Sequence, residues 1–136
     1  MKFTNGYWLK REGVVAHHPT GVDSIDQAED RLTVYAPTRP IRHRGDTLDG
    51  ALLTLTFWSP AADVIGVRVT HHAGALDPDP RFPLNVDAAA TARVQVASDV
   101  ATLTAGRLTV RVNRSGRWAV IFEGDGQPLT RSGWRG

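Results

Sequence analysis

The stretch Arg107-Leu108-Thr109-Val110-Arg111-Val112-Asn113 decides the fold class, because apolar and polar side chains alternate along it with a period of two. Successive side chains of a β-strand point to opposite faces, so this alternation is typical of a strand with one buried and one solvated face. Leu108, Val110 and Val112 form the expected buried face, and the arginines and threonine between them form the solvated one. The segment therefore predicts a β-strand.

The same pattern recurs along the rest of the chain. Four further segments alternate in this way: 31–36, 65–72, 93–96 and 100–104. Segments 52–58 and 118–122 are apolar on both faces, which is typical of strands that lie between two layers. No segment of ten residues keeps the apolar stripe of a helix. The sequence therefore predicts an all-β chain folded as an antiparallel β-sandwich.

Turns and core residues can also be placed from the pattern. Asp125-Gly126 lies between two strand-like segments and predicts a hairpin. The segment 74–85 carries three prolines close together, so we expect an extended surface loop there, with Phe82 available for contacts. Seven residues are expected in the core: Leu55, Phe57, Val67, Val69, Val110, Val120 and Phe122.

Composition excludes several classes of protein. The 136 residues, 41% hydrophobic and 22% charged, suit one globular domain rather than a disordered chain. With no cysteine, the chain can form neither disulfides nor thiolate zinc sites. A net charge of +2, without basic clusters, argues against nucleic-acid binding. The longest apolar stretch, 51–58, is too short to span a membrane, and residues 1–6 lack a signal-peptide pattern, so we expect a cytoplasmic protein.

Carboxylate pairs and histidines are the candidates for catalysis and metal binding. Three pairs of acids lie close in sequence: Asp77 with Asp79, Asp23 with Asp26, and Glu123 with Asp125. Each pair lies in or beside a turn, where such side chains usually bond the local backbone. The dipeptides His17-His18 and His71-His72 could each supply one ligand, but no third ligand is evident, and we expect His71 in the core. We therefore assign no catalytic, cofactor-binding or metal-binding residue.

Aromatic side chains are the remaining candidates for ligand contact. Trp58 and Trp118 lie in the most apolar segments and are expected in the core. Trp8 and Trp134 lie near the ends of the chain, where burial is harder, so they are candidates for contact with a partner or a sugar. Phe82, in the proline-rich loop, is the third such candidate.

Several segments of the chain carry a likeness to one known family when they are taken in order. The likeness begins with Met1-Lys2-Phe3-Thr4-Asn5-Gly6-Tyr7-Trp8-Leu9 and continues with Leu32-Thr33-Val34-Tyr35-Ala36-Pro37. It includes Leu53-Thr54-Leu55-Thr56-Phe57-Trp58-Ser59-Pro60, then Gly74-Ala75-Leu76 and Phe82-Pro83-Leu84-Asn85. The set extends from Met1 to about Leu129, nearly the whole chain, and it resembles the start of bacterial α-xylosidases of glycoside hydrolase family 31.

The resemblance implies an N-terminal, non-catalytic β-sandwich of the galactose-mutarotase-like, or supersandwich, type, spanning 1–136 and either complete or truncated. The catalytic aspartates of such enzymes lie in a (β/α)₈ barrel, so none is carried over, and this chain alone is expected not to be an enzyme. The parent would release α-linked xylose with retention. The sandwich would then serve as scaffold and subunit contact, with a loop at the substrate mouth as a further role.

Two functions remain open from the sequence. The first is the domain of an α-xylosidase-like hydrolase, whose partner is the catalytic barrel of its own parent chain. The second is a stand-alone β-sandwich that binds carbohydrate through exposed aromatic residues. Either way, strands without neighbours and uncovered apolar faces favour a homo-oligomer. No cofactor, nucleic acid or membrane is expected as a partner.

Overall fold

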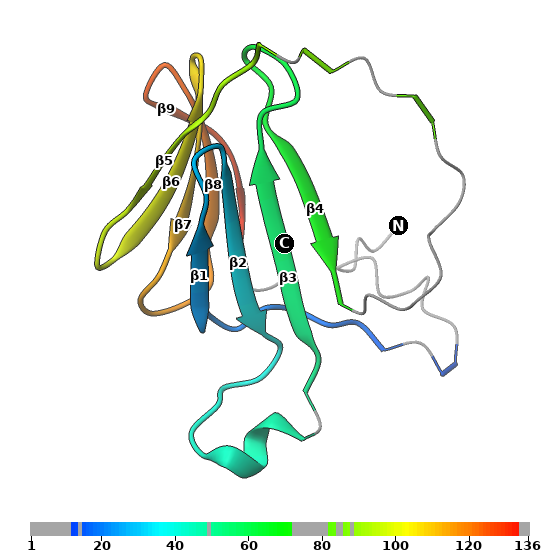
Figure 1. Cartoon of the computed structure of the whole chain (residues 1–136). Helices are drawn as coiled ribbons and strands as arrows, with labels where there is room; N and C mark the ends of the chain where they lie inside the picture. The colour runs from blue at the N-terminus through cyan, green and yellow to red at the C-terminus, as the bar shows by residue number, and fades with distance from the viewer. Residues whose placement is uncertain are drawn as a thin grey trace, which may run out of the picture.

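The chain forms nine β-strands and one short 3-10 helix in the part that a computed structural model describes, residues 12–13, 15–48, 50–71, 82–83, 86–87 and 89–133 (Figure 1). The elements are β1 (Ser24–Gln27), β2 (Arg31–Pro37), η2 (Arg44–Thr47), β3 (Leu52–Trp58), β4 (Gly66–Thr70), β5 (Arg93–Val96), β6 (Val100–Ala105), β7 (Leu108–Asn113), β8 (Val120–Gly124) and β9 (Gln127–Ser132). No helix in these ranges is long and apolar enough to cross a membrane.

The strands form two antiparallel sheets in simple chain order. The first sheet has the order β1-β2-β3-β4 and the second β5-β6-β7-β8-β9, so each strand pairs with its neighbour in sequence. The sheets lie face to face, with β1 against β5 and β2 against β6 (Figure 1). The predicted all-β sandwich is confirmed.

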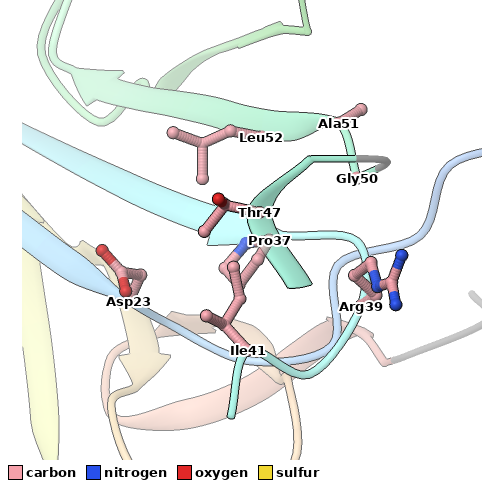
Figure 2. A pocket seen from close by; sticks show the side chains of 8 residues that line it. All are labelled: Asp23, Pro37, Arg39, Ile41, Thr47, Gly50, Ala51 and Leu52. Carbon is pink, nitrogen blue, oxygen red and sulfur yellow. The ribbon is translucent and has the colours of Figure 1, made fainter. Parts of the chain in front are cut away.

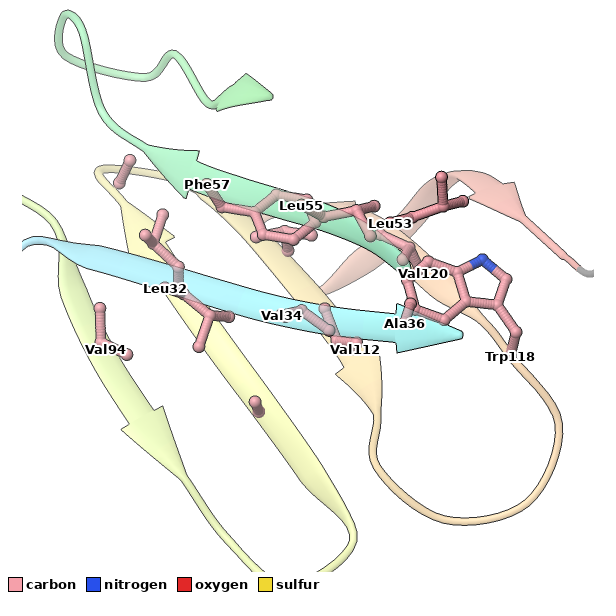
Figure 3. Close-up of a cluster of buried hydrophobic side chains, with 14 residues drawn as sticks. Leu32, Val34, Ala36, Leu53, Leu55, Phe57, Val94, Val112, Trp118 and Val120 are labelled. Carbon is pink, nitrogen blue, oxygen red and sulfur yellow. The ribbon is translucent and has the colours of Figure 1, made fainter. Parts of the chain in front are cut away.

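The core lies between the sheets and follows the predicted alternation. Figure 3 shows the side chains of β2 and β3 packed over those of the second sheet. Leu55 and Val120 are at least nine-tenths buried, and Phe57 and Val110 are completely so, which confirms these four expectations. Trp118 is also buried, as expected, and it closes the end of the core beside Val120 (Figure 3).

Three expected core positions are wrong or only partly right. Val67 and Val69 are 43% and 57% exposed, although the register pairs them with Phe57 and Leu55 and so places them on the inner face. Strand β4 lies at the edge of its sheet, and the second sheet does not cover these two side chains. Phe122 is half-buried and packs against the rim of the core.

The expectation that 52–58 buries both faces is also wrong. Only the face of β3 with Leu53, Leu55 and Phe57 is buried. On the other face Leu52 is 46% exposed and Trp58 is half-buried, because no layer covers the outer side of this sheet among the described residues.

Two turns show how local sequence sets the connections. The predicted hairpin is confirmed, since Asp125 and Gly126 join β8 to β9 with φ of 50° and 76°. Two consecutive positive φ angles match the twist of paired strands, and Asp-Gly tolerates them. Strand β1 was not predicted, because its four residues show little alternation in hydrophobicity.

A polar contact connects the two sheets at one end of the sandwich. The backbone N–H of Arg107, in the β6–β7 turn, donates to Oδ1 of Asp63, in the β3–β4 loop, at 2.6 Å. The Arg107 guanidinium lies 3.5 Å from the same carboxylate. Gly106 has φ of 58°, and a Cβ there would collide with Asp63, so the turn requires glycine.

Candidate functional site

One hollow lies where the loop between β2 and β3 folds back beside the first sheet. Its volume is about 290 Å³. It is lined by the end of β2, the start of β3, the helix η2 and Asp23, which directly precedes β1. Figure 2 shows Asp23 and Arg39 at opposite ends of it, with Ile41 and Thr47 between them. Ile41 is 43% exposed, so the lining offers an apolar side chain together with one charge of each sign, Asp23 and Arg39.

Asp46 gives this loop its shape. Its Oδ2 accepts hydrogen bonds from the backbone N–H groups of Arg42 at 2.9 Å and His43 at 3.3 Å. The hydrogen bond from Arg42 is the main cause that holds the pKa of this carboxyl below its ordinary value. The hydrogen bond from His43 and the positive charge of Arg39 act in the same direction. The His43 ring accepts in turn from the N–H of Gly45, which completes a capping box at η2. Asp46 therefore serves the loop's own structure.

A second hollow lies on the outer face of the first sheet, and we call its lining the Trp58 platform. The register sets its layout in two neighbouring rows: Arg31, Trp58 and Gly66 in one row, and Thr33, Thr56 and Arg68 in the next. These side chains share one face because they alternate with the core residues of β2 and β3. The volume of the hollow is about 400 Å³, and its walls are Arg31, Thr33, Thr56, Trp58 and Arg68.

The indole of Trp58 lies against Gly66 of the neighbouring strand β4. A Cβ on Gly66 would stand 2.5 Å from the ring, so only glycine lets the ring lie there. The guanidinium carbon of Arg68 is 5.9 Å from the ring centroid, within the range of a cation–π interaction. Trp58 was expected in the core, and this is wrong. Trp58 directly follows Phe57, and successive side chains of a strand point to opposite faces, so the alternation itself indicated an outer position for Trp58.

Three of the four described members of the acidic pairs have side-chain partners, and the fourth, Asp23, has none among the described residues and lies at the first hollow. Asp26 accepts a hydrogen bond from the Tyr35 hydroxyl at 2.8 Å, and this bond raises the pKa of the tyrosine. Glu123 lies 3.3 Å from the Arg111 guanidinium, and Asp125 lies 4.0 Å from that of Arg107. These partners are side chains of neighbouring strands and turns, so the expected bonds to the local backbone are wrong for these three acids, although each serves a structural contact. Asp77 and Asp79 lie outside the described residues.

The histidine dipeptides come together in an unexpected way. His71 is exposed, so its expected place in the core is wrong: β4 ends at Thr70, beyond the reach of the second sheet. Its ring stacks on that of His17, with centroids 6.2 Å apart and an interplanar angle of 28°. Among the described residues, no group of three metal-ligating side chains accompanies them.

The three predicted contact residues stay predictions. Phe82 is 73% exposed, as a contact residue would be. Trp8 and Trp134 lie outside the described residues. The sequence interpretation missed the Trp58 platform, whose members lie on three different strands and meet only through the register.

Comparisons with known proteins point to one group of enzymes. The α-xylosidase of Emericella nidulans is 34% identical to this chain over 113 residues, which are 83% of the chain and 14% of that enzyme. The α-xylosidase XylQ of Lactiplantibacillus pentosus is 34% identical over 132 residues, 97% of the chain and 17% of that enzyme. No family model matches the chain. The resemblance to α-xylosidases is thus confirmed over nearly the whole chain, which spans about one-sixth of the length of these relatives.

Proposed function

We propose that this chain is a non-catalytic domain of an α-xylosidase of glycoside hydrolase family 31. In this proposal it binds the remainder of that enzyme through the side of the sandwich where β4, β8 and β9 lie, which we call the open side. The match to a small share of two α-xylosidases supports the first part. Three of the described acids support the non-catalytic role, because Asp26, Asp46 and Asp63 each accept a hydrogen bond that serves a turn, a loop or a strand pair. The cytoplasmic location stays a prediction.

The inner face of β4 carries the second part of the proposal. Val67 and Val69 point to the core side of the sheet by register, yet about half of each side chain is exposed. The two sheets follow the same strand order, so β4 lies on the side of the sandwich where the second sheet ends in β8 and β9. Strand β9 is exposed along its whole length, and Leu129 there is 64% exposed.

The open side suits a strand or apolar segment from the same polypeptide. Among the described strands β4 lies at the edge of its sheet, so one row of its N–H and C=O groups has no strand partner there and is available for a further strand. Covering two valines from water would contribute about 1 kcal/mol or more in total, since each buried CH₂ contributes about 0.8 kcal/mol. A second copy of this chain is the alternative occupant, and it would give the homo-oligomer expected from the sequence.

The catalytic part of the proposal is tested with a chromogenic α-xyloside. The chain alone should release no more chromophore than the buffer, and the polypeptide encoded by its whole reading frame should release it readily. Variants Asp77→Asn and Asp79→Asn serve as controls for a hidden site in the chain. Release by the chain alone that either variant abolishes would refute the non-catalytic role.

A stand-alone carbohydrate-binding module is the second candidate. Exposed Phe82 and the half-buried indole of Trp58 favour it, since both offer apolar rings at the surface. The reading frame separates the two functions. Continuation into a barrel of several hundred residues supports the enzyme domain, and a stop codon directly after Gly136 supports the module.

A further inference from the structure

We propose that the Trp58 platform binds an acidic saccharide, that is, a pyranose ring that carries a carboxylate. The site uses the outer face of the first sheet, so it is separate from the open inner face that the proposed function requires. The choice of a saccharide rests on that proposed function. The preference for an acid rests on the charges of the platform.

Two arginines give the platform its charge. Within the part of the chain that the structure describes, neither Arg31 nor Arg68 forms an ion pair. The register puts Asp26 next to Thr33 on this face. The carboxylate of Asp26 accepts a hydrogen bond from the Tyr35 hydroxyl and does not line the hollow, so it is not a partner of either arginine. A guanidinium binds a carboxylate with two parallel hydrogen bonds. Arg31 and Arg68 lack a carboxylate partner among the described residues, although Arg68 lies in cation–π range of Trp58, so the pair beside one hollow favours an anionic ligand.

Trp58 and two threonines supply the other contacts that a sugar needs. The indole lies across Gly66 and offers an apolar surface beside the hollow, against which the C–H face of a pyranose can pack. The hydroxyls of Thr33 and Thr56 make no hydrogen bond among the described residues, so each can donate to and accept from a sugar hydroxyl. A ring contact, two hydroxyls and two cations together match an acidic sugar better than a bare anion.

The size and openness of the hollow set the expected strength of binding. Its volume of about 400 Å³ can hold one sugar ring and falls in the range of small-molecule sites. Arg31 and Arg68 are exposed on the surface, and solvent weakens charge interactions there. We therefore expect a dissociation constant in the millimolar range, and weaker binding at high salt.

Three small probes separate the possible sources of binding. The chain, labelled with ¹⁵N, is titrated with D-glucuronate, with D-glucose, which has the same ring but no carboxylate, and with acetate, which has a carboxylate but no ring. The signals followed are the indole N–H of Trp58 and the guanidinium Nε–H of Arg31 and Arg68. D-glucuronate should shift all three signals to saturation at concentrations where the other two probes leave them in place.

Matched variants test the assignment of the site. Arg31→Gln and Arg68→Gln should each weaken glucuronate binding about tenfold, the factor expected for one charge-assisted hydrogen bond. Arg93→Gln is the control, because Arg93 is also an exposed residue at the start of a strand, but on the other sheet. Equal shifts with acetate would show an unspecific anion site and overturn the proposal, as would equal shifts with D-glucose or none with any probe. None of these outcomes depends on whether the chain belongs to a longer enzyme.

Discussion

Phe57 and its neighbour Val67 provide the sharpest test of the fold. The two residues are register partners on the same face of the first sheet, yet Phe57 is fully buried and Val67 is 43% exposed. Truncation of a buried phenylalanine to alanine costs about 3–5 kcal/mol, because apolar contacts are lost and a cavity remains. Val67→Ala removes two methyl groups that are only about half buried, so it should lower the free energy of unfolding by about 1 kcal/mol or less.

The difference is large enough to measure by thermal unfolding. For a domain of this size each kcal/mol lowers the melting temperature by about 4 °C, so Phe57→Ala should melt roughly 12–20 °C below the parent chain. Val67→Ala should stay within about 4 °C of it. Circular dichroism of the three proteins at one concentration gives all three values. A Phe57→Ala variant that melts within about 2 °C of the parent, or a Val67→Ala variant that is equally destabilised, would refute the assigned core.

Three further results are expected. Asp63→Asn should lower the melting temperature at about pH 7 but not at about pH 2. The N–H and guanidinium of Arg107 hold the pKa of Asp63 below its ordinary 3.8, so the carboxylate stabilises the fold above pH 3.8 and this stabilisation is lost as the pH falls through the folded-state pKa. An equal loss at both pH values would contradict this. Gly106→Ala should cost more stability than Gly116→Ala, since both have positive φ but only a Cβ at Gly106 meets Asp63; equal melting temperatures would argue against the contact between the sheets. Light scattering over a concentration series should show a dimer or higher oligomer of the isolated chain, and a strict 14.8 kDa monomer at every concentration would mean that no second copy covers the open side.

The sequence predicted the strands well because their signal is local. Alternation with a period of two identifies a strand and its inner face, and Leu55, Phe57 and Val110 are buried accordingly. The same alternation placed Val67 and Val69 on the correct face but could not show that the second sheet fails to reach them. Burial depends on what lies opposite a strand, and that information is not in the strand's own sequence.

The Trp58 platform could not be predicted from the sequence for a related reason. Trp58 and Arg68 are ten residues apart in sequence, and Arg31 lies far from both, so only the register of three strands brings them to one face. A tryptophan in an apolar segment is usually buried, and this general tendency favoured the core for Trp58. Its neighbour Gly66 has no side chain, which leaves room for the indole on the outer face.

Hydrogen–deuterium exchange of β4 tests the central claim most directly. The amides of Gly66–Thr70 are compared in the isolated chain and in the polypeptide encoded by its whole reading frame. If the remainder of an α-xylosidase covers the open side, exchange of these amides should slow at least tenfold in the longer polypeptide, while the amides of β6, which is already central in its sheet, should change little. Equal exchange of β4 in both proteins, or a reading frame that ends at Gly136, would contradict the account.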